Sequence, residues 1–294
     1  MNNIFATYHP VINFLYFTLV ILTTMFIMHP IMLAISLLLA CTTCICMNGK
    51  KGLKFVLMML PMLIIVAIIN PLFNHEGVTT LLFINDNPIT LEACFYGCVS
   101  AMMFVSVIIW FSCYNTVMTS DKFIFLFGRI IPSLSLIFSM VLRLVPRFKA
   151  QLKNITNGQK CIGKGLSQNK LTANIKNSSH VISILLSWGL ENSIDTADSM
   201  KSRGYGLPGR TAFSNFRFDK RDLFALVFLL VTFSSVLLGI LNGQASAKYF
   251  PLIVLSTINF HGVITYLGYA LLLMFPLIVN VTEEIKWTVL KSRI

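Results

Sequence analysis

Two glycine-rich stretches of this 294-residue chain have the spacing of nucleotide-binding loops. "RGYGLPGR" (Arg203 to Arg210) contains a complete G-x-G-x-x-G, which in dinucleotide-binding proteins lies where a buried strand turns into a helix. "GQKCIGKG" (Gly158 to Gly165) contains G-x-x-x-x-G-K, which begins a phosphate-binding loop. Both patterns bind phosphate only in a particular setting, so the elements around them decide what they do.

The setting argues against both kinds of loop. Gly204 follows a stretch with helical periodicity, and Pro208 stands where a dinucleotide fold would begin its helix. In the second stretch, Gly165 takes the place of the Ser or Thr that holds Mg²⁺, and a basic helix precedes it where a buried strand is needed. We therefore expect no bound cofactor and no ATP hydrolysis by this chain.

Other residues with the chemistry of an active site or a metal site are scattered. Cys41 and Cys44 in "CTTCIC" have zinc-like spacing, but they lie in an apolar run without a neighbouring His or acid, so we interpret them as small apolar packing residues. No paired carboxylates lie within an apolar run, and the five histidines are far apart in the sequence: His9, His29, His75, His180 and His261. We expect no catalytic residue and no metal site.

The composition is that of a membrane protein. Hydrophobic residues make up 56% of the chain and charged residues 12%, against about 25% charged in an ordinary soluble domain. Membrane-spanning helices need about 17–25 mostly apolar residues. We predict an all-α, polytopic helical membrane protein with about six spans: Val11–Met28, Ile31–Met47, Leu53–Phe73, Leu91–Val117, Asp222–Leu241 and Gly262–Val281.

Charge in the loops predicts how these spans lie in the bilayer. Lys50 and Lys51 follow the second span in the short turn "MNGKKG", and sixteen of the 23 Lys and Arg residues lie between Asp121 and Arg221. The segment Pro71–Thr90 has neither Lys nor Arg. By the positive-inside rule both termini and the basic middle section are cytoplasmic. The net charge of +12 therefore indicates cytoplasmic loops beside a lipid bilayer, and we expect no nucleic-acid partner.

The middle section is too long for a loop and divides the chain into three regions. Residues 1–117 form the first four spans, residues 118–221 a cytoplasmic region of long helices, and residues 222–294 the last spans and a cytoplasmic tail. Two apolar stretches, Phe123–Val145 and Tyr249–Phe260, do not read as simple spans and are re-entrant, interfacial or packed against the bundle.

Two long helices are predicted in the middle section, at Ser133–Cys161 and Ser178–Arg203. Each ends at a glycine with basic residues nearby, a combination that suits the negative end of the helix dipole and a left-handed cap. These basic, glycine-ended tips are either a docking surface for a soluble partner or a solvated face beside the lipid headgroups.

Residues at both tips resemble a known family. "SMKSRGYG" (Ser199 to Gly206) resembles the Ala-Met-Glu-Ala-Arg-Gly-Tyr segment of the transmembrane (T) component of energy-coupling factor transporters. "LRLVP" (Leu142 to Pro146) resembles the Leu-Arg-Phe-Ile-Pro that opens the first coupling helix of that family. The family's Gln-Arg-Ala-Arg-Gly falls thirteen residues after that proline, which aligns it with Gln159, Lys160, Cys161, Ile162 and Gly163.

The resemblance implies a non-catalytic subunit of an ABC-type importer of vitamins or trace-metal ions in a prokaryotic cell membrane. In that family, each of two coupling helices docks its Ala-Arg-Gly end into a groove of one of two ABC ATPases. The T component also holds a substrate-binding membrane protein, the S component, and passes ATP-driven motion to it. The T component itself binds no substrate and hydrolyses nothing.

Carried over by position, Ser202-Arg203-Gly204 matches the second Ala-Arg-Gly, with Arg203 as a charge-assisted donor to an acidic group of its ATPase. At the first tip the chain departs from the family, because Ile162 stands where the family has arginine. Gly163 is kept, and Lys160 or Lys164 could supply charge beside Cys161. The resemblance with this departure implies that the two tips dock on two non-identical ATPases.

Two other functions remain open on the residues alone. A self-sufficient secondary carrier needs a polar site at mid-membrane, usually on broken helices, and Pro61 and Asn70-Pro71 in the third span are its only hints. Ionisable residues inside the membrane mark ion-coupled pathways, and the predicted spans are nearly free of them. A membrane-embedded lipid enzyme with a basic headgroup-binding region is the other alternative, although no acidic or histidine constellation supports it.

Overall fold

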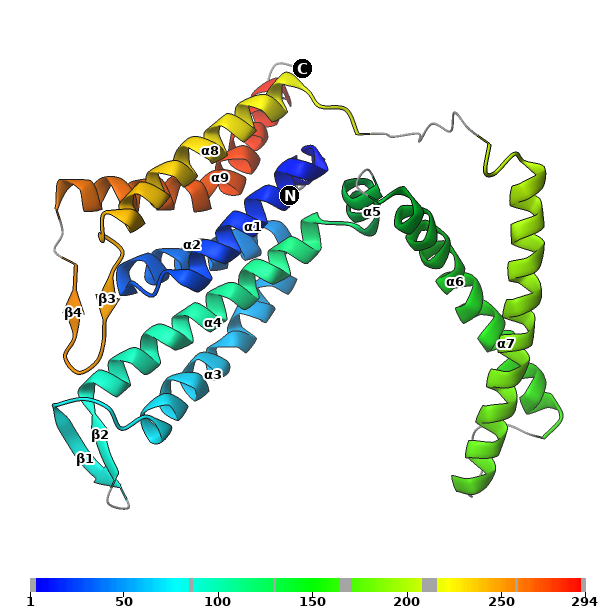
Figure 1. The fold of residues 1–294 in the computed structure, drawn as a ribbon, viewed down its shortest axis with the longest axis horizontal. Coiled ribbons are helices and arrows are strands. Elements are labelled where there is room, and N and C mark those ends of the chain that lie inside the picture. The colour runs from blue at the N-terminus through cyan, green and yellow to red at the C-terminus, as the bar shows by residue number, and fades with distance from the viewer. Residues whose placement is uncertain are drawn as a thin grey trace. The chain divides into compact units, whose positions relative to one another are not determined.

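The computed structural model describes residues 4–84, 87–128, 131–163, 171–207, 216–256 and 259–291, and most of them are helical (Figure 1). The helices are η1 (Ile4–Thr7), α1 (Pro10–Phe26), α2 (Pro30–Asn48), α3 (Lys50–Phe73), α4 (Leu91–Val117), α5 (Ser120–Gly128), α6 (Pro132–Cys161), α7 (Leu171–Ser202), α8 (Lys220–Leu241) and α9 (Phe260–Lys291). The strands are β1 (Thr80–Ile84), β2 (Asn87–Thr90), β3 (Ala247–Lys248) and β4 (Val254–Leu255).

The prediction of a helical polytopic membrane protein is confirmed. Within the described part of the chain, five helices are long and apolar enough to cross a membrane: α2, α3, α4, α8 and α9. The first predicted span corresponds to α1, an apolar helix of 17 residues, which is at the short end of what a bilayer requires. Both α1 and α2 begin with a proline. Proline is favourable there because the N–H that it lacks would have no partner in the first turn of a helix.

The structure corrects several predicted boundaries. The predicted basic turn "MNGKKG" is reduced to Gly49, whose φ of 57° separates α2 from α3, and both lysines belong to α3. Helix α3 runs without interruption through Pro61 and Pro71, so the broken helix on which a carrier site was considered is not observed.

The connections between α3 and α4 and between α8 and α9 contain short strands that the sequence pattern does not predict. Strands β1 and β2 pair antiparallel with Thr80 opposite Thr90, and β3 and β4 pair with Ala247 opposite Leu255. Of the second pair, β3 ends just before the predicted apolar stretch Tyr249–Phe260, and β4 lies within it. In Figure 1 the two hairpins lie at one end of the helix bundle, and the N-terminus, the end of α4 and the start of α8 lie at the other.

The chain divides into two compact units. The first, here called the bundle unit, comprises residues 1–123 and 216–294, and the second, the helix-pair unit, comprises residues 124–215. The bundle unit contains all the candidate spans and the β-hairpins, whereas α6 and α7 form the helix-pair unit.

The core of the bundle unit combines large buried side chains with a closed polar network. Trp110, Tyr16 and Tyr269 are fully buried among apolar residues of α1, α2, α4, α8 and α9. The Thr24 hydroxyl lies 3.2 Å from that of Ser36 and 3.1 Å from that of Tyr269, and Trp110 Nε1 donates to Ser36 Oγ at 3.1 Å. Because lipid offers no hydrogen-bond partners, such mutual pairing is what allows these groups to be buried between helices.

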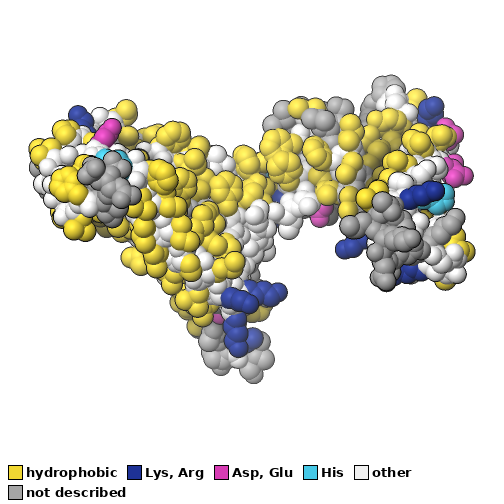
Figure 2. All heavy atoms as spheres, turned by 90° about the horizontal axis from the view of Figure 1, so that it is seen from below, with side chains coloured by type: hydrophobic (Ala, Val, Ile, Leu, Met, Phe, Trp, Pro, Cys, Tyr) yellow, Lys and Arg dark blue, Asp and Glu magenta, His cyan; other side chains and the backbone are white. Residues whose placement is uncertain are grey.

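The surface of the bundle unit is mainly apolar, as lipid requires. Figure 2 shows hydrophobic side chains (yellow) over most of the face in view, with Lys and Arg (dark blue) gathered in a few groups. Helix α3 is the most exposed span, since only 6% of its apolar window is buried inside the protein. A face this apolar needs lipid or another membrane protein against it.

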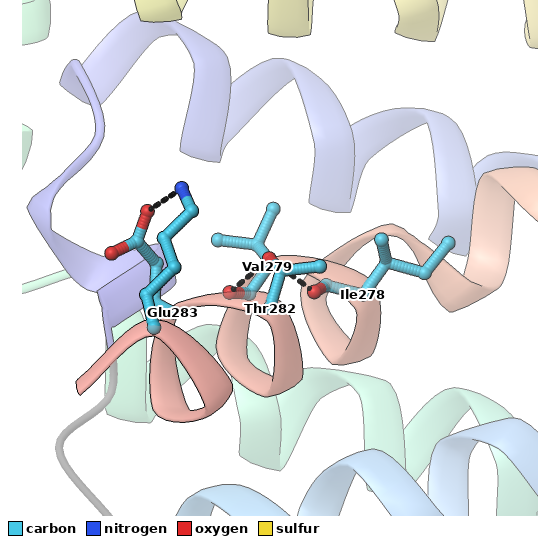
Figure 3. A network of polar contacts seen from close by, with 5 residues as sticks. Ile278, Val279, Thr282 and Glu283 are labelled. Carbon is cyan, nitrogen blue, oxygen red and sulfur yellow. Dashed lines mark hydrogen bonds and ion pairs between the residues drawn. The ribbon is translucent and has the colours of Figure 1, made fainter. Parts of the chain in front are cut away.

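Helix α9 outlasts the predicted sixth span by ten residues. Its apolar part ends near Val281, as predicted, but the helix continues through a polar last section (Figure 3). Thr282 Oγ1 donates to the carbonyls of Ile278 at 2.8 Å and Val279 at 3.0 Å, and Lys286 Nζ pairs with Glu283 Oε1 at 2.9 Å. The apolar run marked the length of the span, and these local contacts extend the helix beyond it.

Close packing of α3 on α4 depends on Gly97. A Cβ added there would lie 2.7 Å from the backbone oxygen of Ala67 and 3.2 Å from Pro71 Cδ, and neither atom can move without shifting α3. We expect Gly97→Ala to destabilise the protein by about 1–3 kcal/mol, measured as a lower midpoint of thermal unfolding in detergent. Gly262→Ala is the control, because the nearest atom there is the mobile amide end of Gln244, and it should be neutral or stabilising by up to about 1 kcal/mol. Equal effects of the two substitutions would contradict this account.

Candidate functional site: the ends of α6 and α7

Helices α6 and α7 pack against each other near their middles. The rings of Phe148 and Trp188 meet edge to face with centroids 5.3 Å apart. Val181, about two turns before Trp188 on α7, is buried at 3% exposure. A Cβ added to Gly189 would lie 2.7 Å from Phe148 Cζ, so the missing side chain is what lets the Phe148 ring reach the α7 backbone. Phe148 and Gly189 therefore mark the crossing point of the two helices.

The crossing point divides each helix so that the two C-terminal arms have equal length. Thirteen residues separate Phe148 from Cys161 at the end of α6, and thirteen separate Gly189 from Ser202 at the end of α7. At 1.5 Å per residue each arm is about 20 Å long. The two tips lie at different ends of the helix-pair unit (Figure 1), so one crossing supports two separate, equally distant tips.

The tip of α7 is closed by a Schellman cap. Tyr205 N donates to the carbonyl of Met200 at 3.0 Å, and Gly204 N donates to that of Lys201 at 3.0 Å. Gly204 has a φ of 84°, a left-handed conformation that glycine adopts without strain. In this cap Arg203 is the C-cap residue, and its exposed side chain lies at the negative end of the helix dipole.

The tip of α6 repeats the part of this cap that the described residues include. Gly163 N donates to the carbonyl of Lys160 at 3.1 Å, and Gly163 has a φ of 75°. Gly163 therefore takes the position of Gly204, Ile162 that of Arg203, and Cys161 that of Ser202. The alignment by sequence register thus corresponds to matching positions in the two helix caps.

The two tips offer different chemistry from the same backbone geometry. All the tip residues other than Gly204 are exposed, with Ile162 at 63% and Tyr205 at 49%. The planar guanidinium of Arg203 can bind a carboxylate with two parallel hydrogen bonds. Ile162 suits an apolar pocket, and the exposed Lys160 lies two residues before it in the last turn of α6. The side chain of Arg203 thus suits an acidic surface, and that of Ile162 suits an apolar one.

The nucleotide-binding patterns lie in surroundings that differ from those of nucleotide-binding loops. Gly158 is inside α6 and Gly204 is the second residue after α7, whereas both loops need a strand before their first glycine. Lys164, Gly165 and the segment 208–210 lie outside the described residues.

Sequence reasoning located both tips but missed the crossing point. The predicted helix at Ser133–Cys161 agrees with α6 to one residue, whereas α7 begins at Leu171, seven residues before the prediction. A lone glycine inside a helical pattern, as at Gly189, is a signal of close packing. Its partner Phe148 lies about forty residues away, and no local pattern pairs the two.

The cap of α7 gives a test of its geometry. Gly204→Ala places a side chain at a φ of 84°, at a cost of about 1–2 kcal/mol, and its Cβ would lie 3.2 Å from Leu207 Cδ1. We expect faster amide hydrogen exchange over residues 199–205, because the two bonds that close the cap open more often. Gly204→Asn is the matched variant, since asparagine tolerates this conformation, and it should exchange more slowly than Gly204→Ala. Identical exchange in both variants would show that the left-handed cap does not hold this end.

Comparison with known proteins gives one informative similarity. No protein-family model matches the sequence. The chain is 29% identical over 102 residues to the energy-coupling factor transporter transmembrane protein EcfT of Lactobacillus helveticus. The matched region covers 34% of this chain and 37% of the relative, so the chain spans little more than a third of that protein's length in the match.

Proposed function

We propose that this chain is the transmembrane coupling subunit of an energy-coupling factor transporter in a prokaryotic cell membrane. The observation that carries the proposal is the pair of equivalent caps, Cys161-Ile162-Gly163 and Ser202-Arg203-Gly204, held at equal distances from one helix crossing. Two matching ends on one helix pair suit two related partners. The similarity to an EcfT protein supports the same function.

In this function, each tip docks on one of two ABC ATPases. Arg203 binds an acidic group in one groove, and Ile162 fills a more apolar groove of a second, non-identical ATPase. Closure of the ATPases on ATP moves the tips, and α6 and α7 transmit the movement to a substrate-binding S component in the membrane. The chain contributes binding and mechanical coupling, and hydrolysis belongs to the ATPases.

The same proposal orients the chain in the membrane. The tips must face the cytoplasm to meet the ATPases, so both chain termini are cytoplasmic and the β1–β2 and β3–β4 hairpins are outside. The excess of basic residues in the helix-pair region agrees with this orientation. The substrate is set by the S component, a vitamin or a trace-metal ion.

Copurification with the ABC ATPases of its own organism tests the proposal. Arg203→Glu removes one charge pair and places a second negative group against an acidic one, which should cost about 2–5 kcal/mol of binding free energy, at least a thirtyfold loss of affinity. Lys51→Glu makes the same charge change at an exposed lysine of α3 and serves as the control. We expect stable capture of the ATPases by the wild type and the control, and loss of one ATPase with Arg203→Glu.

Ile162→Asp probes the other tip. A carboxylate in an apolar groove is desolvated without a partner, so this variant should lose the second ATPase and keep the first. If both variants release the same ATPase, the two tips do not recognise different partners. If the wild-type protein captures no ATPase while remaining monodisperse, the chain is not a coupling subunit.

A further inference from the structure

Two connecting segments of the chain join the helix-pair unit to the bundle unit. Residues near both connections bond to the same short segment at the start of the chain. The chain leaves the bundle unit after Phe123 and returns to it at Phe216. Near each connection, a buried charged side chain bonds to the backbone of the N-terminal segment Phe5–His9, which includes most of η1. We call this segment the N-terminal strap.

At the exit, Lys122 holds the strap. Its side chain is buried at 6% exposure, and Nζ donates to the carbonyls of Ala6 at 2.5 Å and Val117 at 2.9 Å. Val117 is the last residue of α4. One ammonium group therefore ties the end of a span, the start of α5 and the strap together.

Where the chain returns to the bundle unit, Asp222 holds the strap with the opposite charge. It is buried at 1% exposure, Oδ1 accepts a hydrogen bond from His9 N at 3.2 Å, and Oδ2 accepts one from Asp219 N at 3.0 Å. The guanidinium of Arg221 lies over the Tyr8 ring at 4.5 Å. The first turn of α8 is thus fixed to the strap by a carboxylate and a cation–π contact.

The strap is anchored in the core of the bundle unit. Phe5 N donates to Asn280 Oδ1 of α9 at 3.1 Å. The Phe5 ring is fully buried and lies edge-on against the rings of Tyr16 at 5.3 Å and Phe275 at 5.8 Å. A force applied to the strap therefore reaches α1 and α9 directly.

The charge of Lys122 is costly to bury, which separates its role from simple packing. Burial lowers the pKa of Lys122 to about 8 from its usual value near 10.5, because removal from water disfavours the ammonium. The unfolded chain thus binds this proton more tightly than the folded protein, so the ammonium lowers stability at neutral pH and the penalty fades as the pH rises from about 8 to 10.5. Charged groups bonded to backbone also fix position more strictly than an apolar contact does.

We infer that Lys122 and Asp222 are positioning residues that make the N-terminal strap a clamp. Through this clamp, movement of α6 and α7 is passed to the helices of the bundle unit instead of being lost in the connecting segments. The inference rests on the proposed coupling function. With both hydrogen-bonded contacts to the strap intact, a force on either connecting segment acts on α4, α8 and α9 together. With these contacts broken, residues beside each connection change their backbone dihedral angles under the force, and less of it reaches the helices.

Hydrogen exchange in the assembled complex tests the clamp. The full-length protein, bound to its ATPases in nanodiscs, is compared with and without a non-hydrolysable ATP analogue. In the wild type we expect the analogue to change exchange at the tips and, by about fivefold or more, in residues 5–9 and 216–224, as for a typical allosteric coupling. In Lys122→Met and Asp222→Asn the response at the tips should remain, and the response of the strap should fall by at least that factor.

Three variants separate positioning from stability. Lys122→Arg keeps two donors and a charge, and it should restore the strap's response to the analogue. Thr24→Val removes buried hydrogen bonds elsewhere in the bundle unit, so it should lower stability but keep the response. A wild-type strap that ignores the analogue while the tips respond would overturn the clamp, as would Lys122→Met and Asp222→Asn that respond like the wild type. Failure of the wild type to bind the ATPases would instead contradict the proposed function.

Discussion

Lipid neither donates nor accepts hydrogen bonds, and this constraint determines how the rest of the chain is built. Each backbone group in a span must be paired within its own helix, so the bundle unit consists of helices and places its short strands at one end. Buried hydroxyls follow the same rule. Thr23 and Thr43 return their hydrogens to carbonyls one turn back, and the Thr24–Ser36–Tyr269 group satisfies itself across three helices.

Because the spans have so little freedom, the distinctive chemistry lies where helices end. At the ends of α6 and α7, exposed carbonyls are closed by glycine caps that present Ile162 and Arg203 in equivalent positions. At the end of α4 and the start of α8, Lys122 and Asp222 bond to the backbone of the N-terminal strap. Charged groups are tolerated in these places because backbone there still has unpaired donors and acceptors.

The predictable features are those set by residues close together in the sequence. Apolar length located six helices in the bundle unit to within a few residues at most ends, and a glycine stop located each tip to the residue. Helix α7 begins earlier than predicted because its first turns, from Leu171, are polar and carry no apolar period. The hairpins pair through backbone groups that leave little mark on the sequence.

Long-range pairs were out of reach of such reasoning. The crossing of Phe148 with Gly189 joins residues about forty positions apart, and the bonds from Lys122 to Ala6 and from His9 to Asp222 join residues more than a hundred apart. Single lysines and aspartates near helix ends are common, and their burial becomes visible only once the strap is folded between them.

The crossing of α6 and α7 has a mechanical consequence. Measured from Phe148 and Gly189, the N-terminal arms of sixteen and eighteen residues are longer than the thirteen-residue arms that bear the tips, so rigid rotation enlarges a displacement about 1.2-fold and 1.4-fold. The bending moment on a loaded lever is greatest at its fulcrum, and each helix is weakened there, α6 by Pro146 two residues from Phe148 and α7 by Gly189. Under the proposed coupling function, the helix pair is therefore compliant at its crossing, and part of an abrupt movement of the tips is taken up there as bending before it reaches the far ends.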